Sequence, residues 1–539
     1  MSQRSEPKTF NPVTMADRDS AKVIDLLNAD LIHINRSNFR VEPALAKSWT
    51  LSADARTYTL VLRRGVRFSD GHPFDADDVV FSFGLYLDEA VRSPQRDLLV
   101  ISGRPLQVRK VDAYTIAFML PSRYAAGERL FDSIPILPRH VLHKSAKARE
   151  LSSAWGVNTD PKQIVGLGPF RLKQFVPGQR VVLERNPFYW KADSAGQRLP
   201  YLDEVISEVV PNSEAEAMRF LSGGTDLMNR MTAANFAALK PEERRRDFRL
   251  YDLGPGFEYS FLFFNLNSAP AVANSGLAEK QKWFSELGFR QAVAEVIDRD
   301  SIVRLVYRGS AYPLSGPMSP ANSFWADRRV PRPVRSVPQA REWLRKAGFH
   351  WSRSGSLQDR GGTSVELSLL VNTANRQQQQ MGVIIQQDLK ELGIHVTLNA
   401  LEYRSFLHRL FSSFDYETAI MTLADGDADP NTELSFLLST GTNHVWGLKP
   451  GRIPTWQIEI DVLMQKQLTA RNSAERKQWF DQVQESLWRN KPVVFLISPN
   501  ILVGASNEIG NFNPAKLPDY TLWNADQLFH RSQQRTTGR

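Results

Sequence analysis

The sequence predicts a mixed α/β protein with several domains, and three observations support this fold class. The chain has 539 residues, and at about 150 residues per domain this length predicts roughly three to four domains. Forty-two per cent of the residues are apolar and 10% are aromatic, a composition that excludes global disorder. Strand-like and helix-like patterns alternate, most clearly over residues 365–398.

Residues 365–398 predict a βαβ unit. Residues 365–371 form an apolar strand, and residues 378–392 place apolar side chains on one face of a helix that ends at Gly393. Residues 394–398 then alternate between apolar and polar as a second strand. The two strands are therefore expected to be parallel.

Other elements follow from the same periodicities. In the first half, residues 58–62 alternate as a strand, and Asp75 is the expected N-cap of a helix whose first turn contains Asp78. The aromatic run 257–265 predicts a buried strand that crosses between two structural units. In the last part, the sequence predicts two helices and a strand, at 458–468, 474–488 and 493–497.

The composition also limits the chemistry. The chain has no cysteine, which excludes thiolate nucleophiles, cysteine-bound metals and disulfides. It has no HExxH, GxSxG or GxxxxGK[ST] motif, so the usual enzyme signals are absent and no cofactor or metal site is expected. Its formal net charge is +9, and residues 327–360 hold nine basic and three acidic residues.

The basic segment 327–360 allows two interpretations. Its basic residues are interleaved with tryptophans, a combination that can bind nucleic acid. Prolines at 331, 333 and 338 and a helical pattern over 339–347 favour instead an extended arm that leads to a solvated helix. We therefore expect no nucleic-acid partner.

The acidic loop 425–430 is the most suggestive polar cluster. It resembles the start of a calcium loop, but Pro430 and Phe436 occupy the positions where an EF-hand needs glycine and glutamate. Three interpretations remain: a helix-capping turn, a carboxylate for a ligand ammonium, or one half of a glycosidase carboxylate pair.

No stretch approaches the roughly 20 apolar residues that a membrane span needs. The first residues, 1–7, are polar and lack the apolar core of a signal peptide. The protein is therefore either cytoplasmic or an exported chain shown without its export signal.

Several segments, taken in order, resemble the solute-binding proteins of peptide and nickel ABC importers, family 5. The longest match runs from Trp49 to Val79. The shorter matches lie at 166–170, 183–190, 289–292, 297–299 and 392–394. The resemblance extends from about Thr9 to beyond Pro499.

The resemblance implies a periplasmic binding protein-like fold of type II, cluster C, with two lobes, a hinge and three interleaved domains. The expected core domain of the first lobe combines residues 1–47, 158–255 and 492–539. Residues 48–157 are its expected additional domain, and 256–491 the second lobe.

The resemblance also suggests ligand-binding residues. Residues Asn35, Arg36, Ser37 and Asn38 correspond to a strand edge that pairs with a peptide backbone, although a plain surface loop is the alternative. Tyr259, Phe261 and Phe263 are expected to share one face of their strand, where they line the ligand cleft or the lobe core. The remaining candidates are Arg409, Met421, Thr422, Asp425, Asp427, Asn443, His444 and Trp446.

The expected function is that of an extracytoplasmic receptor, without catalysis, which binds an oligopeptide or a similar solute between its lobes. It would act as a monomer, with or without a lipid anchor in its full-length form, and deliver the solute to ABC permease subunits. The alternatives are binding of an oligosaccharide or a nickel complex on the same fold, and a glycoside hydrolase with paired carboxylates.

Overall fold

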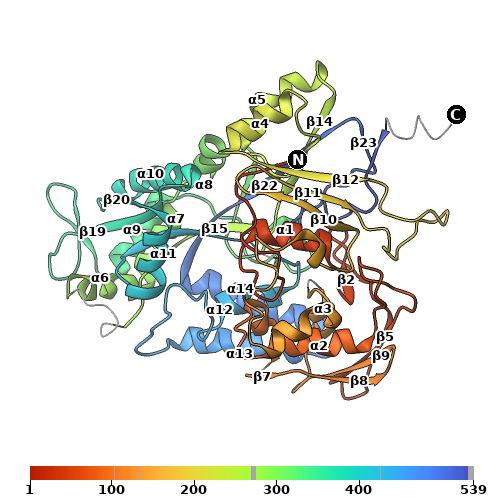
Figure 1. Cartoon of the computed structure of the whole chain (residues 1–539). Helices are drawn as coiled ribbons and strands as arrows, with labels where there is room; N and C mark the ends of the chain where they lie inside the picture. The colour runs from red at the N-terminus through yellow and green to blue at the C-terminus, as the bar shows by residue number, and fades with distance from the viewer. Residues whose placement is uncertain (102, 133, 269–274, 425, 532–539) are drawn as a thin grey trace. The chain divides into compact units, whose positions relative to one another are not determined.

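The computed structural model describes residues 1–101, 103–132, 134–268, 275–424 and 426–531 (Figure 1). The chain forms two compact units. The first unit combines Met1–Tyr251 with Leu502–Arg539, and the second is Asp252–Ile501. The chain therefore passes from one unit to the other twice. The three-domain division expected from the sequence stays a prediction.

Two four-stranded sheets and five helices form most of the first unit. One sheet has the order β1-β12-β11-β10 and the other β4-β5-β9-β8, and only the β1-β12 pair is parallel. The strands are β1 (Ser2–Gln3), β10 (Phe170–Val176), β11 (Arg180–Arg185), β12 (Glu204–Val209), β4 (Ala46–Leu51), β5 (Thr57–Leu62), β8 (Gln107–Asp112) and β9 (Thr115–Met119). The helices are α1 (Arg18–Leu27), α2 (Ala76–Leu87), α3 (Arg139–Lys147), α4 (Ser213–Leu221) and α5 (Ala233–Leu239).

Short strand pairs complete this unit. They are β2 (Ile32–Ile34) with β3 (Val41–Pro43), β6 (Val100–Ile101) with β7 (Arg104–Pro105), and β23 (Ile509–Gly510) with β24 (Phe529–His530). One large hydrophobic core connects both four-stranded sheets, from Phe10 through Phe83 and Phe118 to Phe170. The residues of the expected additional domain, 48–157, share this core with the rest of the unit.

The predicted start of helix α2 is confirmed. Asp75 is its N-cap, and its side chain accepts the N–H of Asp77 at 2.8 Å. Asp78 completes a capping box, because its carboxylate accepts the backbone N–H of Asp75 at 3.1 Å. The two carboxylates therefore satisfy N–H groups that the helix leaves without partners.

The second unit is built on a mixed sheet with the order β22-β15-β21-β19-β20. Strand β14 (Phe248–Pro255) carries the chain into this unit, and β22 (Val493–Ser506) carries it out. The other strands of this unit are β15 (Glu258–Phe264), β16 (Ala311–Pro313), β17 (His350–Trp351), β18 (Leu357–Gln358), β19 (Glu366–Asn372), β20 (His395–Leu401) and β21 (Thr418–Ala424), and β13 is the short strand Leu227–Met228. Strand β13 belongs to the first unit, where it pairs with the end of β22.

The predicted βαβ unit is confirmed. Strands β19 and β20 pair in parallel from Glu366 with His395 to Asn372 with Leu401. Helix α10 (Arg376–Lys390) connects them, and Gly393 follows it with a φ of 77°. Glycine adopts this left-handed backbone without the strain that a side chain would cause. The aromatic strand 257–265 is also present as β15, although it lies wholly within the second unit.

Helices cover both faces of this sheet. On one face Leu262 and Phe264 contact a core that includes α6 (Ser275–Ser285), α7 (Leu287–Val296), α9 (Val337–Lys346) and α10. On the other face lie α11 (Tyr403–His408), α12 (Leu434–Leu437), α13 (Thr455–Thr469) and α14 (Ser473–Asn490). The three-residue helix α8 (Arg299–Ser301) follows α7. The fold class is therefore α/β, as predicted.

Two buried arginines fasten helix α7 to the end of helix α14, and the segment after α7 to strand β22. Arg290 donates to the carbonyl of Asn490 at 3.0 and 3.1 Å, and Arg299 donates to that of Phe495 at 2.8 Å. Burial lowers the pKa of each guanidinium to about 10. These two residues belong to the matched segments 289–292 and 297–299, and their observed contacts serve the fold.

Candidate functional site

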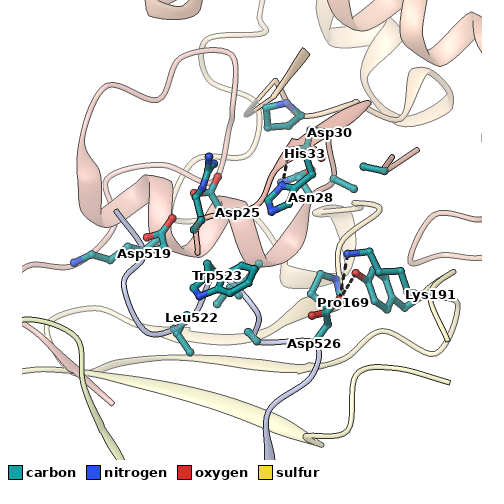
Figure 2. A pocket seen from close by; sticks show the side chains of 18 of the residues that line it. Asp25, Asn28, Asp30, His33, Pro169, Lys191, Asp519, Leu522, Trp523 and Asp526 are labelled. Carbon is teal, nitrogen blue, oxygen red and sulfur yellow. Dashed lines mark hydrogen bonds and ion pairs between the residues drawn. The ribbon is translucent and has the colours of Figure 1, made fainter. Parts of the chain in front are cut away.

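The first unit contains a polar cavity of about 130 Å³, which we call the first-unit cavity (Figure 2). Its walls come from the end of α1, strand β2, Pro169, the segment 189–191 after β11, and the loop 519–526 near the carboxyl end. Segments that are far apart in sequence thus meet at one place. The cavity is the candidate functional site.

Gly168 allows two backbone segments in one wall of the cavity to approach each other closely. A Cβ at Gly168 would lie 2.5 Å from the backbone nitrogen of Asn28 and 2.6 Å from the carbonyl of Leu26. Gly168 N–H also donates to the carbonyl of Leu27 at 3.0 Å. The end of α1 and the segment before Pro169 can approach this closely only because residue 168 has no side chain.

A second wall is fixed by a buried carboxylate. Asp526 accepts a hydrogen bond from the hydroxyl of Tyr189 at 3.0 Å and lies 3.3 Å from the ammonium of Lys191. Between them, Trp190 lines the cavity, and its buried indole N–H has no hydrogen-bond partner among the described residues. This N–H is a buried donor whose hydrogen-bonding capacity is not used.

Charged groups on and next to β2 are paired with one another. His33 Nδ1 lies 3.2 Å from Asp30 and 3.6 Å from Asp132, and Arg36 lies 3.1 Å from the other oxygen of Asp132. Burial opposes the charged form of His33, but the two carboxylates raise its pKa above the ordinary value. Burial likewise opposes the charge of Arg36, and Asp132 raises the pKa of the guanidinium.

The same group has the residue types of a metal site. The ligand atoms of Asp30, His33 and Asp132 all lie within 4.8 Å of one another, and within the described part of the chain no other group meets this criterion. Their observed hydrogen bonds and ion pairs already explain the arrangement.

Two further carboxyls meet at the cavity. Asp25, on α1, and Asp519 both line the cavity and lie close enough for their carboxyls to influence each other. Asp25 keeps an exposed surface, and the partial loss of solvent around its carboxyl, together with the nearby Asp519, raises its pKa above the ordinary value.

The structure corrects the prediction of a strand at Asn35–Asn38. These residues form the turn between β2 and β3. The side-chain oxygen of Asn35 accepts the N–H groups of Ser37 and Asn38 at 2.9 and 3.2 Å, which closes the turn. Arg36 lines the first-unit cavity, and the ligand role of all four residues stays a prediction.

The three aromatic candidates on β15 are buried on one face, as the alternation predicts. Tyr259, Phe261 and Phe263 are each at most 1% exposed and belong to the core beneath α12, α13 and α14. The hydroxyl of Tyr259 donates to the carboxylate of Glu433 at 2.6 Å. Their contacts here are with the core, and their role toward a ligand stays a prediction.

Strand β21 places the next candidates beside them. Met421 pairs with Phe261, and Thr422 pairs with Ser260, whose hydroxyl lies 2.8 Å from that of Thr422. Asp427 accepts the N–H of Ala428 at 2.6 Å. The other acidic candidate, Asp425, lies outside the described residues, so both carboxylate interpretations of this loop stay open.

The remaining candidates also lie in the second unit. Arg409 is partly exposed and 3.9 Å from Asp415. Asn443 donates to the hydroxyl of Ser435 at 3.1 Å. Trp446 is 2% exposed, and its ring centroid is 3.9 Å from that of the buried His444. The indole N–H of Trp446 is buried without a hydrogen-bond partner in the part of the chain that the structure describes.

His444 predicts a measurable pH dependence. Burial lowers its pKa from 6.5 to about 4, so the unfolded chain takes up a proton at mildly acidic pH that the folded chain does not. Between pH 6.5 and 4 this residue is expected to remove about 3 kcal/mol from the free energy of unfolding. Urea denaturation at pH 7 and 4.5 should show a smaller loss for His444→Gln than for the wild type, and equal losses would contradict the assignment.

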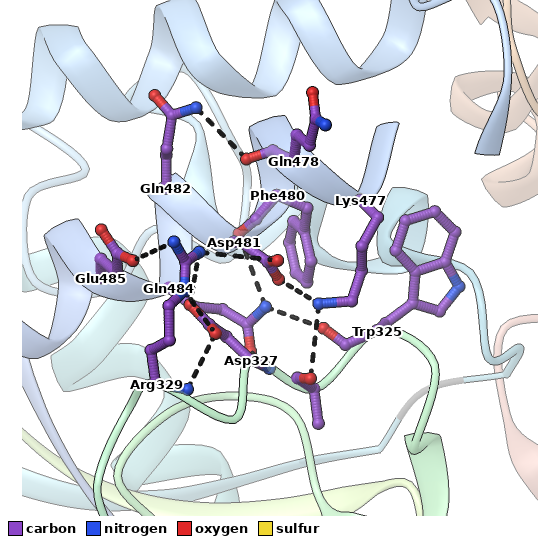
Figure 3. A network of polar contacts seen from close by, with 11 residues as sticks. Trp325, Asp327, Arg329, Lys477, Gln478, Phe480, Asp481, Gln482, Gln484 and Glu485 are labelled. Carbon is purple, nitrogen blue, oxygen red and sulfur yellow. Dashed lines mark hydrogen bonds and ion pairs between the residues drawn. The ribbon is translucent and has the colours of Figure 1, made fainter. Parts of the chain in front are cut away.

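The basic segment 327–360 is largely neutralised by nearby acids. Figure 3 shows Arg329 between three carboxylates, 3.0 Å from Asp327, 3.6 Å from Asp481 and 3.0 Å from Glu485. Further pairs are Arg332 with Asp300, Arg335 with Asp388 and Glu391, and Arg345 and Lys346 with Glu342. These ion pairs support the interpretation that the segment 327–360 is an arm, and they hold it against the second unit.

Residues 40–444 match the family model of the bacterial extracellular solute-binding proteins, family 5, middle region. The chain therefore belongs to this family, whose members bind solutes outside the cytoplasm. Within the described ranges, no helix is long and apolar enough to cross a membrane.

Individual relatives cover nearly the whole chain. A probable ABC transporter-binding protein of Deinococcus radiodurans is 26% identical over 97% of this chain and 90% of its own length. The oligopeptide-binding protein AppA of Bacillus subtilis is 25% identical over 92% of this chain and 85% of its own. The structure of that protein with a nonapeptide has a TM-score of 0.76 at 23% identity, with 98% of each chain covered. This likeness confirms the predicted periplasmic binding protein-like fold class.

Sequence reasoning missed most of the first-unit cavity. Among its lining residues it named only Arg36, and it missed Asp25, Trp190, Asp519 and Trp523. A signal was present, because two of the segments that carry the family resemblance, 166–170 and 183–190, end at the cavity.

Proposed function

We propose that the chain is the extracytoplasmic receptor of an ABC importer, that it has no catalytic activity of its own, and that its solute is a peptide. Family membership and the full-length similarity to an oligopeptide-binding protein support this proposal. The receptor hands its peptide to the permease subunits of the importer.

One observation in the structure carries the choice of a peptide. Two residues that line the first-unit cavity have a buried polar atom without a partner among the described residues: the indole N–H of Trp190, a donor, and the side-chain oxygen of Asn28, an acceptor. Each buried polar group without a partner costs about 1–3 kcal/mol. A peptide backbone offers a carbonyl and an N–H at every residue, so one ligand can satisfy both groups.

Thermal unfolding with defined ligand panels tests the proposal. A panel of di- to octapeptides is expected to contain members that raise the melting temperature by several degrees, because a ligand that binds only the folded state stabilises it. Oligosaccharides and nickel complexes serve as comparison panels. Stabilisation by one of these panels alone would contradict the peptide assignment, and hydrolysis of a glycoside would contradict the non-enzyme assignment.

A further inference from the structure

We propose that Asp132 and Arg129, which are not among the described residues that line the first-unit cavity, are positioning residues for solute binding. They hold the turn between β2 and β3 in one conformation, in which His33 and Arg36 line the cavity. This inference rests on the proposed peptide-binding function and concerns the same site. Any effect of Asp132 on a solute must pass through the residues that it holds.

Asp132 contacts both the backbone and the side chains of this hairpin. One of its carboxylate oxygens accepts the backbone N–H of Ile34 at 2.7 Å and lies 3.6 Å from Nδ1 of His33. The other oxygen accepts a hydrogen bond from the guanidinium of Arg36 at 3.1 Å. The side chain of Asp132 is only 7% exposed, and hydrogen bonds to a carboxylate are stronger than those between neutral groups. One buried carboxylate therefore fixes the end of β2 and both cavity-lining side chains.

Arg129 holds the other end of the turn. Phe39 has a φ of 63°, a left-handed backbone that is unfavourable for a residue with a side chain. Its N–H donates to the carbonyl of Asn35 at 2.8 Å, and its own carbonyl accepts the guanidinium of Arg129 at 2.7 Å. A strained conformation of this kind persists only where its surroundings hold it. Arg129 belongs to the 3₁₀ helix Gly127–Phe131 and Asp132 follows that helix, so one segment fixes both ends of the turn.

The surroundings of Arg36 explain why Asp132 sets a position and not merely a charge balance. The carboxylates of Asp25, Asp30 and Asp519 line the same cavity as Arg36. Without Asp132, the guanidinium would still lie among carboxylates, but the hydrogen bond that fixes its place would be lost. Its loss is therefore expected to displace the Arg36 side chain and loosen the turn, with the unit still folded.

Hydrogen exchange on the full chain tests the turn without a solute. In Asp132→Asn, the amide oxygen can still accept the N–H of Ile34, but the amide nitrogen cannot accept the guanidinium of Arg36. The backbone amides of residues 35–40 are expected to exchange about tenfold faster than in the wild type, and those of β5 in the same unit at an unchanged rate. Arg129→Met should also speed exchange in the turn. Equal protection of the turn in the wild type and Asp132→Asn would overturn the proposal.

Peptide affinity tests the link to the solute. The probe is the member of the di- to octapeptide panel that raises the melting temperature of the wild type most. Asp132→Asn is expected to weaken its binding about tenfold, and by less than about threefold when Arg36→Met is already present. A merely structural role of Asp132 would weaken binding equally with and without Arg36, and this result would overturn the positioning role.

Glu128→Gln is the matched control. Glu128 lies on the same segment, and its carboxylate accepts the indole N–H of Trp49 on β4 at 3.3 Å. This variant should keep the wild-type peptide affinity and the wild-type exchange of residues 35–40. If no panel peptide binds the wild type, the proposed function fails, and the solute role of Asp132 with it. If the wild type and Asp132→Asn bind the probe equally, the peptide function stands and the positioning role is wrong.

Discussion

Replacement of Asp429 by alanine is expected to lower the free energy of unfolding by about 3–5 kcal/mol. Asp429 and Arg476 form a two-point ion pair at 2.7 and 2.8 Å, and their side chains are 5% and 6% exposed. The variant leaves the guanidinium buried without this partner. Arg476 also lies over the ring of Trp325 and contacts Gln467, so its surroundings cannot easily open to water.

Urea denaturation measures this effect, and the same unit offers a matched control. Arg329 contacts three carboxylates but is 61% exposed, so Arg329→Met should cost no more than about 1 kcal/mol. A loss for Asp429→Ala as small as that for Arg329→Met would show that burial does not set the strength of these pairs.

The second large effect is expected for Gly168→Ala. The added Cβ would overlap backbone atoms of Leu26 and Asn28 at 2.5–2.6 Å, and backbone cannot rotate away as a side chain can. We expect a loss of about 3 kcal/mol or more in the free energy of unfolding. Peptide affinity should fall as well, because Asn28 and Pro169 line the first-unit cavity.

Gly84→Ala is the control for the glycine substitution. Gly84 lies within helix α2, and a Cβ there would meet no atom within 4 Å. Alanine favours a helix over glycine, so this variant should be unchanged or more stable by up to about 1 kcal/mol. A similar loss in both glycine variants would contradict the close approach at Gly168.

The sequence predicted best those elements that short-range patterns specify. The α2 capping box depends on residues three positions apart, Asp75 and Asp78, and the βαβ unit on apolar periodicity between 365 and 398. At Asn35–Asn38 the sequence left a strand edge and a surface loop as alternatives. The turn forms because the side-chain oxygen of Asn35 accepts the N–H groups of Ser37 and Asn38, a cause that no apolar pattern records.

The first-unit cavity could not be predicted in the same way. The hydrogen bond between Tyr189 and Asp526 joins positions 337 residues apart, and no local pattern records which carboxylate a tyrosine will meet. The buried state of Trp446 depends similarly on Phe436 and His444, which pack around it in the folded unit. Tertiary packing, not residue type, decides whether such an aromatic ring faces a ligand or a core.

Native mass spectrometry of the full chain, incubated with an equimolar mixture of neutral and basic tripeptides, tests the central claim most directly. The account predicts one bound peptide per wild-type chain. Retention of no peptide by the wild type, with a saccharide bound from a parallel mixture, would contradict it.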